Sequence, residues 1–305
     1  MAFDDLPPLR EIPGMGKMRP EAPKHNAYVM EASRKVAEST RTKLDVPYGN
    51  SYWHKIDVYL PEDTTLRDLP IFCMLHGGGF VRGYKEWMGF QAPVITSLPA
   101  IYISVSYRLA PEAKVPEITD DCLHALKLVY ERAGDWGGDA NRIFIGGHSA
   151  GAILVAQMAL WKEGLERHSL PGDVIKGCFP VAGVYNLDPG WLPADTILAT
   201  VFPDLFDDAA DAINYSPLNH VIGNTTPFMV CWGNADTQYV LDSSEELVAA
   251  LSNQPGLVKR QVWEGYNHFD AHRRLENIDN PMVVTLRDWM QNPPGLAASD
   301  ATASE

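Results

Sequence analysis

The chain lacks several features that would place it in a specialised class of protein. Its 305 residues include only four cysteines, without a CxxC spacing, and no apolar run is long enough to cross a bilayer. Basic residues are in deficit, with 25 Lys and Arg against 39 Asp and Glu, and the net charge is −14. Such a surface repels phosphate backbones and anionic lipids, so binding to nucleic acid or to a membrane is not expected.

The amino-terminal sequence is not expected to act as a targeting signal. The amino terminus, MAFDDLPPLREIPGMGKM, has no basic start followed by an apolar core, so no secretory signal is predicted and the cytoplasm is the expected compartment. Three of the four cysteines fall in apolar runs; the cysteines are predicted to be core thiols, and no disulfide or metal site is expected. Residues 293–305, PPGLAASDATASE, are predicted to be a disordered tail because they are small and polar.

What is present is the composition of a globular protein with a sizeable core, 46% hydrophobic and 21% charged. Short apolar segments alternate with helix-length stretches along most of the chain. This alternation predicts an α/β fold with a mostly parallel central sheet and helices on both faces. The predicted strands span 71–75, 101–107, 142–146, 174–183, 227–233 and 259–265, and the predicted helices span 85–97, 117–133, 150–164, 239–252 and 270–291.

Two regions fall outside this alternation. Residues 1–40 are predicted to be an N-terminal segment with an amphipathic cap helix over 25–40, and the next segments, TKLDVPYG and HKIDVYLPE, to pair as antiparallel edge strands. Residues 185–225 are too long for a simple crossover and are predicted to be a helical lid insertion. We therefore expect one domain over 41–292 that contains this insertion.

The segment IFIGGHSAGA (143–152) combines a strand end, a glycine-flanked serine and a helix start. Gly147 and Gly151 stand two residues on either side of Ser149, which is the pattern G-x-S-x-G. A strand that turns this sharply into a helix strains its central residue, and side chains at both glycine positions would clash. The pattern predicts an exposed Ser149 hydroxyl at the positive end of a helix, although a Gly/Ser-rich turn can produce the same letters by chance.

Three consecutive glycines, Gly77, Gly78 and Gly79, follow an early predicted strand in MLHGGGF. Their backbone N–H groups can approach a ligand closely because no side chains cover them. The oxyanion of acyl transfer needs two or three such donors, and we predict two amides from this loop together with that of Ala150. A phosphate loop would need GxxxxGK[ST], which is missing here, and His76 is expected to brace the loop.

A serine nucleophile needs a base that is held by an acid, and in a sheet of this type the chain order is serine, acid, histidine. Asp236 follows one predicted strand and His268 follows the next, so both are expected at the same rim as Ser149. The weaker alternatives are Asp242 for the acid and His220 or His272 for the base.

Four segments, HGGGF, SYRLAPE, GHSAGA and GYNHFD, together resemble the α/β-hydrolase superfamily over about residues 45–290. HGGGF and SYRLAPE are similar to the hormone-sensitive-lipase-like carboxylesterases. GHSAGA, AGVYNLDP and NYSP are similar to the kynurenine formamidases (arylformamidases). By this resemblance, Ser149, Asp236 and His268 match the nucleophile, acid and base, the HGG region with Ala150 matches the oxyanion hole, and no metal or organic cofactor is implied.

Three functions are consistent with these residues. The first is a serine carboxylesterase that cleaves small, aromatic or short-acyl esters through an acyl-enzyme. The second is hydrolysis of an aryl formamide such as N-formylkynurenine, which requires a tight acyl pocket. The third, a binding protein of the hydrolase fold without turnover, is disfavoured because every predicted catalytic residue is present. The expected partner is a small ester or formamide, and a homodimer is left open.

Large aromatic residues lie in the predicted insertion and near the rim. They are predicted to line an apolar substrate pocket, and packing of the lid onto the body explains them equally well. These candidates are Phe80, Trp191, Phe202, Phe206 and Tyr266.

Overall fold

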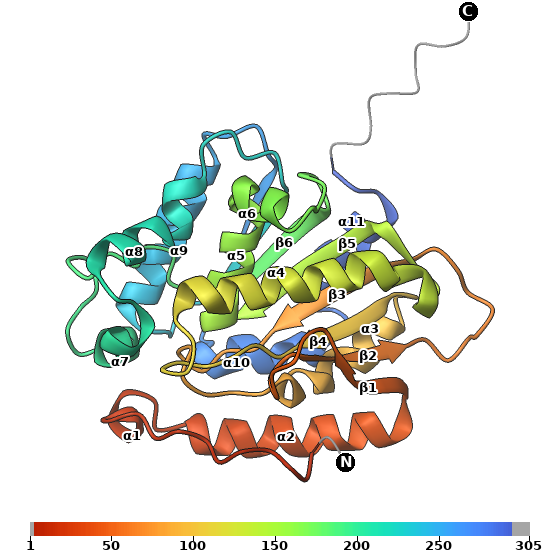
Figure 1. Cartoon of the computed structure of the whole chain (residues 1–305), viewed down its shortest axis with the longest axis horizontal. Helices are drawn as coiled ribbons and strands as arrows, with labels where there is room; N and C mark the ends of the chain where they lie inside the picture. Colours follow the sequence, from red (N-terminus) through yellow and green to blue (C-terminus); the bar gives the residue numbers. More distant parts are fainter. Residues whose placement is uncertain (1–2, 295–305) are drawn as a thin grey trace, which may run out of the picture.

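The computed structural model of the chain describes residues 3–294 (Figure 1), so the predicted tail lies outside the described residues except for 293 and 294. Within this range an eight-stranded sheet has the strand order β1-β2-β4-β3-β5-β6-β7-β8. The pairs β1–β2 and β2–β4 are antiparallel, and all later neighbours are parallel, which confirms the predicted mostly parallel sheet with antiparallel strands at one edge. The strands are β1 (Arg41–Pro47), β2 (Lys55–Leu60), β3 (Leu69–Leu75), β4 (Ile101–Val105), β5 (Gly138–His148), β6 (Ile175–Val181), β7 (Phe228–Gly233) and β8 (Val258–Trp263).

The central strands are apolar because both of their faces are covered. Strands β3, β4 and β7 are buried at every position. All four cysteines are buried free thiols, as predicted. Figure 1 shows α4 in front of the sheet and α11 behind it. The helices are α1 (Met15–Met18), α2 (Ala22–Ser39), α3 (Ala92–Thr96), α4 (Val115–Arg132), α5 (Ala150–Leu160), α6 (Lys162–Arg167), α7 (Ile197–Leu205), α8 (Ala209–Asn214), α9 (Gln238–Leu251), α10 (His268–Arg273) and α11 (Pro281–Gln291).

Three predicted helices are broken in the structure. The stretch 150–164 divides at Trp161, whose backbone leaves the helical region, into α5 and α6. The stretch 270–291 divides into α10, a 3₁₀ turn and α11; Asn280 caps α11 and Pro281 begins it, so the helix starts afresh there. The stretch 85–97 consists of two 3₁₀ turns, η1 (Lys85–Trp87) and η2 (Gly89–Gln91), followed by the short α3.

The N-terminal segment packs against the rest of the molecule through one face of α2. The buried residues of this helix, Ala22, His25, Val29 and Ser33, recur at intervals of three and four, which is the spacing of one helical face. The Ser33 hydroxyl accepts a hydrogen bond from the backbone N–H of Phe90 at 2.8 Å, which ties α2 to η2. Figure 1 shows α2 along one edge of the molecule, near α10, and α1 next to α7.

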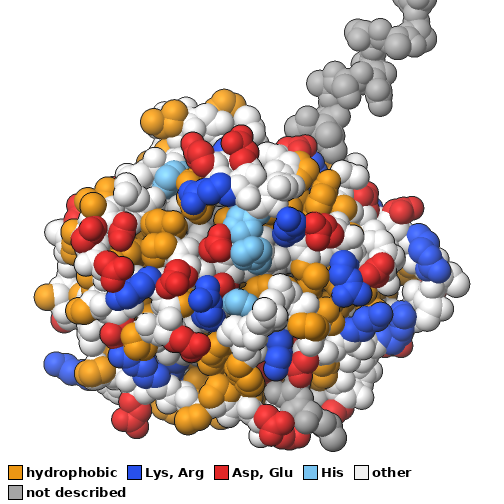
Figure 2. Space-filling model, in the orientation of Figure 1, with side chains coloured by type: hydrophobic (Ala, Val, Ile, Leu, Met, Phe, Trp, Pro, Cys, Tyr) orange, Lys and Arg blue, Asp and Glu red, His pale blue; other side chains and the backbone are white. Residues whose placement is uncertain are grey.

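The predicted insertion, residues 185–225, contains α7, α8 and the 3₁₀ turn η4 (Pro217–His220). The Thr196 hydroxyl caps α7 by accepting a hydrogen bond from the Ala199 N–H at 3.2 Å. Residues 3–294 contain no helix that is both long and apolar enough to span a bilayer. Figure 2 shows acidic, basic and hydrophobic side chains interspersed over one face of the molecule.

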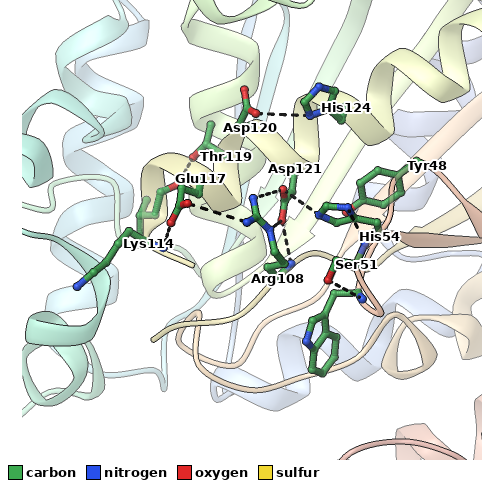
Figure 3. Close-up of polar contacts among 12 residues, drawn as sticks. Tyr48, Ser51, His54, Arg108, Lys114, Glu117, Thr119, Asp120, Asp121 and His124 are labelled. Atoms are coloured by element: carbon green, nitrogen blue, oxygen red, sulfur yellow. Dashed lines mark hydrogen bonds and ion pairs between the residues drawn. The ribbon is translucent and has the colours of Figure 1, made fainter. Parts of the chain in front are cut away.

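The segment SYRLAPE forms the start of the connection from β4 to α4. The Arg108 guanidinium donates two hydrogen bonds to Asp121 of α4, of 2.8 Å from Nε to Oδ2 and 2.7 Å from Nη2 to Oδ1, and the Arg108 backbone N–H donates a third to Oδ2 at 3.1 Å (Figure 3). His54 Nε2 lies 3.0 Å from Asp121 Oδ1 on another side of the carboxylate. Because Asp121 is buried, this charged cluster fixes the connection against α4.

Candidate active site

Ser149 occupies a sharp turn between the end of β5 and the start of α5. Its backbone angles, φ 57° and ψ −118°, are strained for a residue with a side chain. A Cβ atom at Gly147 would collide with the backbone of Gly151, and one at Gly151 would collide with the Leu75 and His76 carbonyls of the neighbouring strand. The glycines therefore allow the close approach that exposes the serine, as the sequence pattern predicts.

His268 and Asp236 form a hydrogen-bonded pair. The His268 ring lies with Nδ1 2.6 Å from Asp236 Oδ2, and the carboxylate side chain is fully buried. Asp236 follows β7, and His268 is the first residue of α10, which begins after β8. Asn267 caps this helix by accepting hydrogen bonds from two N–H groups of its first turn, so the position of His268 is fixed by the cap.

The N-terminal segment supplies a cation to the same carboxylate. Arg19 Nη2 lies 3.0 Å from Asp236 Oδ1, and the Arg19 side chain is only 6% exposed. The backbone N–H of Thr237 donates to the same oxygen at 2.7 Å. Burial acts to raise the pKa of Asp236, but the charges and hydrogen bonds of His268, Arg19 and Thr237 outweigh it and hold the pKa well below its usual range. Asp236 is therefore a carboxylate throughout the neutral range.

The glycine loop lies directly against the serine turn. A Cβ atom at Gly77 would come within 2.9 Å of the Ser149 Cβ, and Gly78 and Gly79 adopt φ values of +122° and +65°, where side chains are strained. His76 Nδ1 donates to the Gly77 carbonyl at 2.8 Å. Burial lowers the pKa of His76 to about 4, so the ring is neutral and braces the loop, as expected.

A cavity of about 60 Å³ brings these groups together. Its lining includes Ser149, Ala150, His268 and the three glycines, which the sequence predicts at one rim. The rest of the lining comes from the N-terminal segment, from α7 and α9, and from residues in or near the motifs that were not predicted to line a site. These further residues are Ile12, Met15, Arg19, His25 and Asn26 of the N-terminal segment, Arg82, Trp87 and Met88 before α3, His148 and Ile153, Ala182 and Val184, Ile197 and Leu198 of α7, Tyr239 and Val240 of α9, and Phe269 and His272 of α10.

The five aromatic residues predicted for the substrate pocket do not line this cavity. Phe80 is fully buried, and Phe202 and Phe206 pack on each other with ring centroids 5.3 Å apart. Tyr266 stacks on Trp263 at 5.9 Å, and Trp191 is half-buried in the insertion. The structure places these side chains in packing contacts, and the aromatic rings at the cavity are those of Trp87, Phe269 and Tyr239.

The alternative acid and bases are also located elsewhere or engaged. Asp242 accepts a hydrogen bond from Gln238 on the exposed side of α9. His220 in η4 donates to the Asn214 carbonyl and does not line the cavity. His272 lines the cavity, but its ring stacks on His148, with centroids 4.6 Å apart. Asp242 is not hydrogen-bonded to His268, and the hydrogen bonds of His220 and His272 are made to Asn214 and His25, whereas His268 is paired with Asp236.

His25 and His272 form a second hydrogen-bonded pair at the cavity wall. His272 Nδ1 lies 3.2 Å from His25 Nε2. Burial is the main cause that lowers the pKa of both rings. The pKa of His25 falls to about 3, and both rings are therefore neutral. A neutral imidazole has one N–H and one lone pair, and one ring must donate to the other. In either tautomer, the two remaining nitrogens are one donor and one acceptor.

These two nitrogens, His25 Nδ1 and His272 Nε2, are buried and find no hydrogen-bond partner among residues 3–294. Buried polar groups without partners cost free energy, so a ligand that supplies both partners gains affinity from them.

Sequence reasoning missed Arg19 and His25, because nothing in their local sequence marks them. His148 stood inside the serine motif, and its Nε2 donates to the His268 carbonyl at 3.0 Å.

Comparison with known proteins agrees with this architecture. A profile described as alpha/beta hydrolase fold matches residues 72–271. The kynurenine formamidase of Salmo salar is 32% identical over 273 residues, covering 87% of this chain and 88% of that protein. An isoprenylcysteine alpha-carbonyl methylesterase of Arabidopsis thaliana is 24% identical and covers 76% of this chain, and the chain spans 57% of its length. The chain spans 52% and 59% of the length of two further plant methylesterases of this kind, from Arabidopsis thaliana and Oryza sativa.

Solved structures show the same fold. The thermostable carboxylesterase EstE1, cloned from a metagenomic library, superposes with a TM-score of 0.69 at 24% identity, covering 88% of this chain and 97% of that chain. The profile match includes the end of β3, the serine turn, β7 and the start of α10. These parts carry the glycine loop, Ser149, Asp236 and His268. By its sheet, its serine turn and these matches, the chain belongs to the α/β-hydrolase fold family.

Proposed function

We propose that the protein is a serine hydrolase that cleaves small aromatic or short-acyl carboxylic esters through an acyl-enzyme. The observation that carries this proposal is the convergence of Ser149, the His268–Asp236 pair and the glycine loop on one cavity. Nucleophile, base, acid and amide donors are the complete set of groups that acyl transfer needs.

In the proposed mechanism, Ser149 Oγ attacks the substrate carbonyl while His268 Nε2 takes the hydroxyl proton. The negative oxygen that forms is bound by backbone N–H groups of the glycine loop and of Ala150. His268 then gives its proton to the leaving alcohol, and Asp236 holds the imidazole in the required tautomer through Nδ1. Water, activated by the same histidine, attacks the acyl-serine, which releases the acid and restores the Ser149 hydroxyl.

The alternative is an arylformamidase that hydrolyses the amide bond of N-formylkynurenine or a related aryl formamide. One observation favours it: the relative from Salmo salar matches nearly the whole chain, and its name is that of such an enzyme. The substrate in both proposals is a small molecule.

The unpaired state of the four cysteines supports the predicted cytoplasmic location. All four cysteines are unpaired, which fits a compartment where thiols stay reduced. Fractionation of cells that produce the protein with an epitope tag tests this part of the proposal, and recovery with secreted or envelope proteins contradicts it.

One panel of substrates separates the two chemistries. The kcat/KM values for nitrophenyl esters from acetate to octanoate are compared with that for N-formylkynurenine. The ester proposal predicts a maximum among the short acyl chains, whereas the formamide proposal predicts that N-formylkynurenine exceeds every ester. In both cases Ser149→Ala loses at least about 10⁴-fold in kcat, and the exposed serine variant Ser97→Ala keeps full activity. Activity of Ser149→Ala at the wild-type level rejects both proposals.

A further inference from the structure

A second cluster of ligating side chains lies on the surface, outside the cavity. Asp120 and His124 stand one helical turn apart on α4, and His168 follows the last residue of α6. His168 Nε2 lies 2.6 Å from Asp120 Oδ1, and His124 Nδ1 lies 3.5 Å from Asp120 Oδ2. One ligand atom from each residue lies within 4.8 Å of those of the other two. None of the three residues lines the cavity at Ser149.

The cluster is both fixed and accessible. The i, i+4 spacing places Asp120 and His124 on one face of α4, and Figure 3 shows their side chains side by side on that helix. His168 is 7% exposed, and its backbone N–H is held by the Gly164 and Leu165 carbonyls of α6, so the third ligand is set in place by the fold. Asp120 and His124 are exposed, and Figure 2 shows histidine side chains beside acidic ones on the face that carries α4.

The donor set determines which ion fits. Two imidazoles and one carboxylate suit borderline transition metals such as Zn²⁺ and Ni²⁺, whereas Mg²⁺ and Ca²⁺ prefer sites built entirely from oxygen. Bond lengths of roughly 2.0–2.2 Å to Zn²⁺ require the ligand atoms to surround the ion a little over 3 Å apart. The three ligand atoms lie within 4.8 Å of one another, so they have to close around an ion, and two of the three side chains, those of Asp120 and His124, are exposed.

We propose that Asp120, His124 and His168 form a binding site for a divalent transition-metal ion, with Zn²⁺ or Ni²⁺ as ligand and water completing its coordination. In this site the ion takes the position of the hydrogen between His168 Nε2 and Asp120, and the neutral ring of His168 then carries its one proton on Nδ1. The bound ion joins α4 to the end of α6. The next residue of α4, Asp121, holds Arg108, so the ion also stabilises the helix to which the SYRLAPE connection is attached.

Titration calorimetry of the chelator-treated full chain with ZnCl₂, and separately with NiCl₂, tests the proposal. We expect one ion per chain with micromolar affinity and no heat from MgCl₂. His124→Ala and Asp120→Asn, both at exposed positions, each weaken binding by at least about tenfold. His220→Ala removes a histidine outside the cluster and serves as the matched control, with wild-type affinity.

A second control addresses the histidines of the cavity. His25→Phe removes one imidazole of that group and should leave the affinity and stoichiometry of Zn²⁺ unchanged. Absence of binding by the wild-type chain at about 1 mM metal overturns the proposal. So does wild-type affinity in His124→Ala, or loss of the bound ion in His25→Phe, because either result places the ion elsewhere on the chain.

Discussion

The two sides of the cavity at Ser149 are built in different ways. We call the side formed by Gly77–Gly79, Ser149, Ala150 and His268 the floor, and the side formed by Ile12–Asn26 with Ile197 and Leu198 the cover. The floor consists of turns at strand ends, where close backbone approach requires glycine and leaves a readable pattern. The cover consists of apolar and polar side chains from distant segments. Local sequence patterns therefore place the catalytic groups, whereas the shape of the pocket depends on packing between segments that are distant in the sequence.

Arg19 is the exception to this division. It belongs to the N-terminal segment, and yet it contacts Asp236, the carboxylate beneath the floor, at 3.0 Å. Single substitutions in the floor, in the cover and at Arg19, each measured separately, therefore show whether the two sides of the cavity act independently.

The largest effect should come from Asp236, the acid that is hydrogen-bonded to His268 of the floor. Asp236→Asn keeps the size of the side chain but loses the charge that orients and supports the imidazole, and kcat should fall roughly 10⁴-fold. Steady-state kinetics on the best substrate of the panel measures the change. Asp242→Asn, the matched control on α9, should retain wild-type kcat, and the opposite pattern would move the acid to Asp242.

Removal of the buried cation should have a smaller effect on the same step. Arg19→Met preserves much of the apolar stem but leaves Asp236 without one of its charged partners, and kcat should fall about 10-fold to 100-fold. The pKa of Asp236 should rise towards its ordinary value, because one cause of its depression is removed. Arg132→Met, which breaks an exposed pair with Asp135, is the control and should be indistinguishable from wild type. Equal rates for all three proteins would show that the floor needs no support from the N-terminal segment.

A change in the cover should affect selectivity rather than turnover. His25→Phe retains an aromatic ring stacked on Phe269 but removes the free nitrogen at the cavity wall. We expect KM for N-formylkynurenine, which offers donors and acceptors on its aryl portion, to rise about tenfold. The KM for nitrophenyl acetate, which lacks such a donor, should stay within about threefold of wild type. A uniform decrease of kcat for both substrates would instead assign His25 to the chemical step.

The smallest predicted effect is on stability at acidic pH. Burial lowers the pKa of His25 to about 3 and that of His76 to about 4, whereas both are ordinary in the unfolded chain. The unfolded state therefore binds more protons below about pH 6.5, and the free energy of unfolding decreases as the pH falls towards the folded-state values. Each ring contributes at most about 1.4 kcal/mol per pH unit. Urea unfolding from pH 7 to pH 4.5 should show a shallower slope for His25→Phe, and identical slopes would mean that the native-state pKa of this ring is not lowered.

The difference between floor and cover also explains what could be predicted from the sequence. The strand succession, the strained Ser149 and the order of Asp236 and His268 are local patterns, and the structure brings all of these groups to one rim. The break at Trp161 was missed because helix-compatible residues continue across it, whereas the start signal Asn280-Pro281 was present in the sequence and was overlooked. The aromatic residues of the insertion were interpreted as pocket residues because hydrophobicity predicts burial without saying against which surface. Arg19 meets a loop more than two hundred residues away, and no local pattern encodes such a contact.

The bond between Arg19 and Asp236 bears on how truncated proteins should be judged. A shortened chain that starts after Arg19 would keep every motif and the whole stretch of 72–271 on which family membership is recognised. However, Asp236 would lose its buried counter-ion, and the cavity would lose the part of its cover that precedes residue 20. Fragments that begin after Arg19 would then show slow and unselective catalysis, which would result from the truncation and not from the intact enzyme.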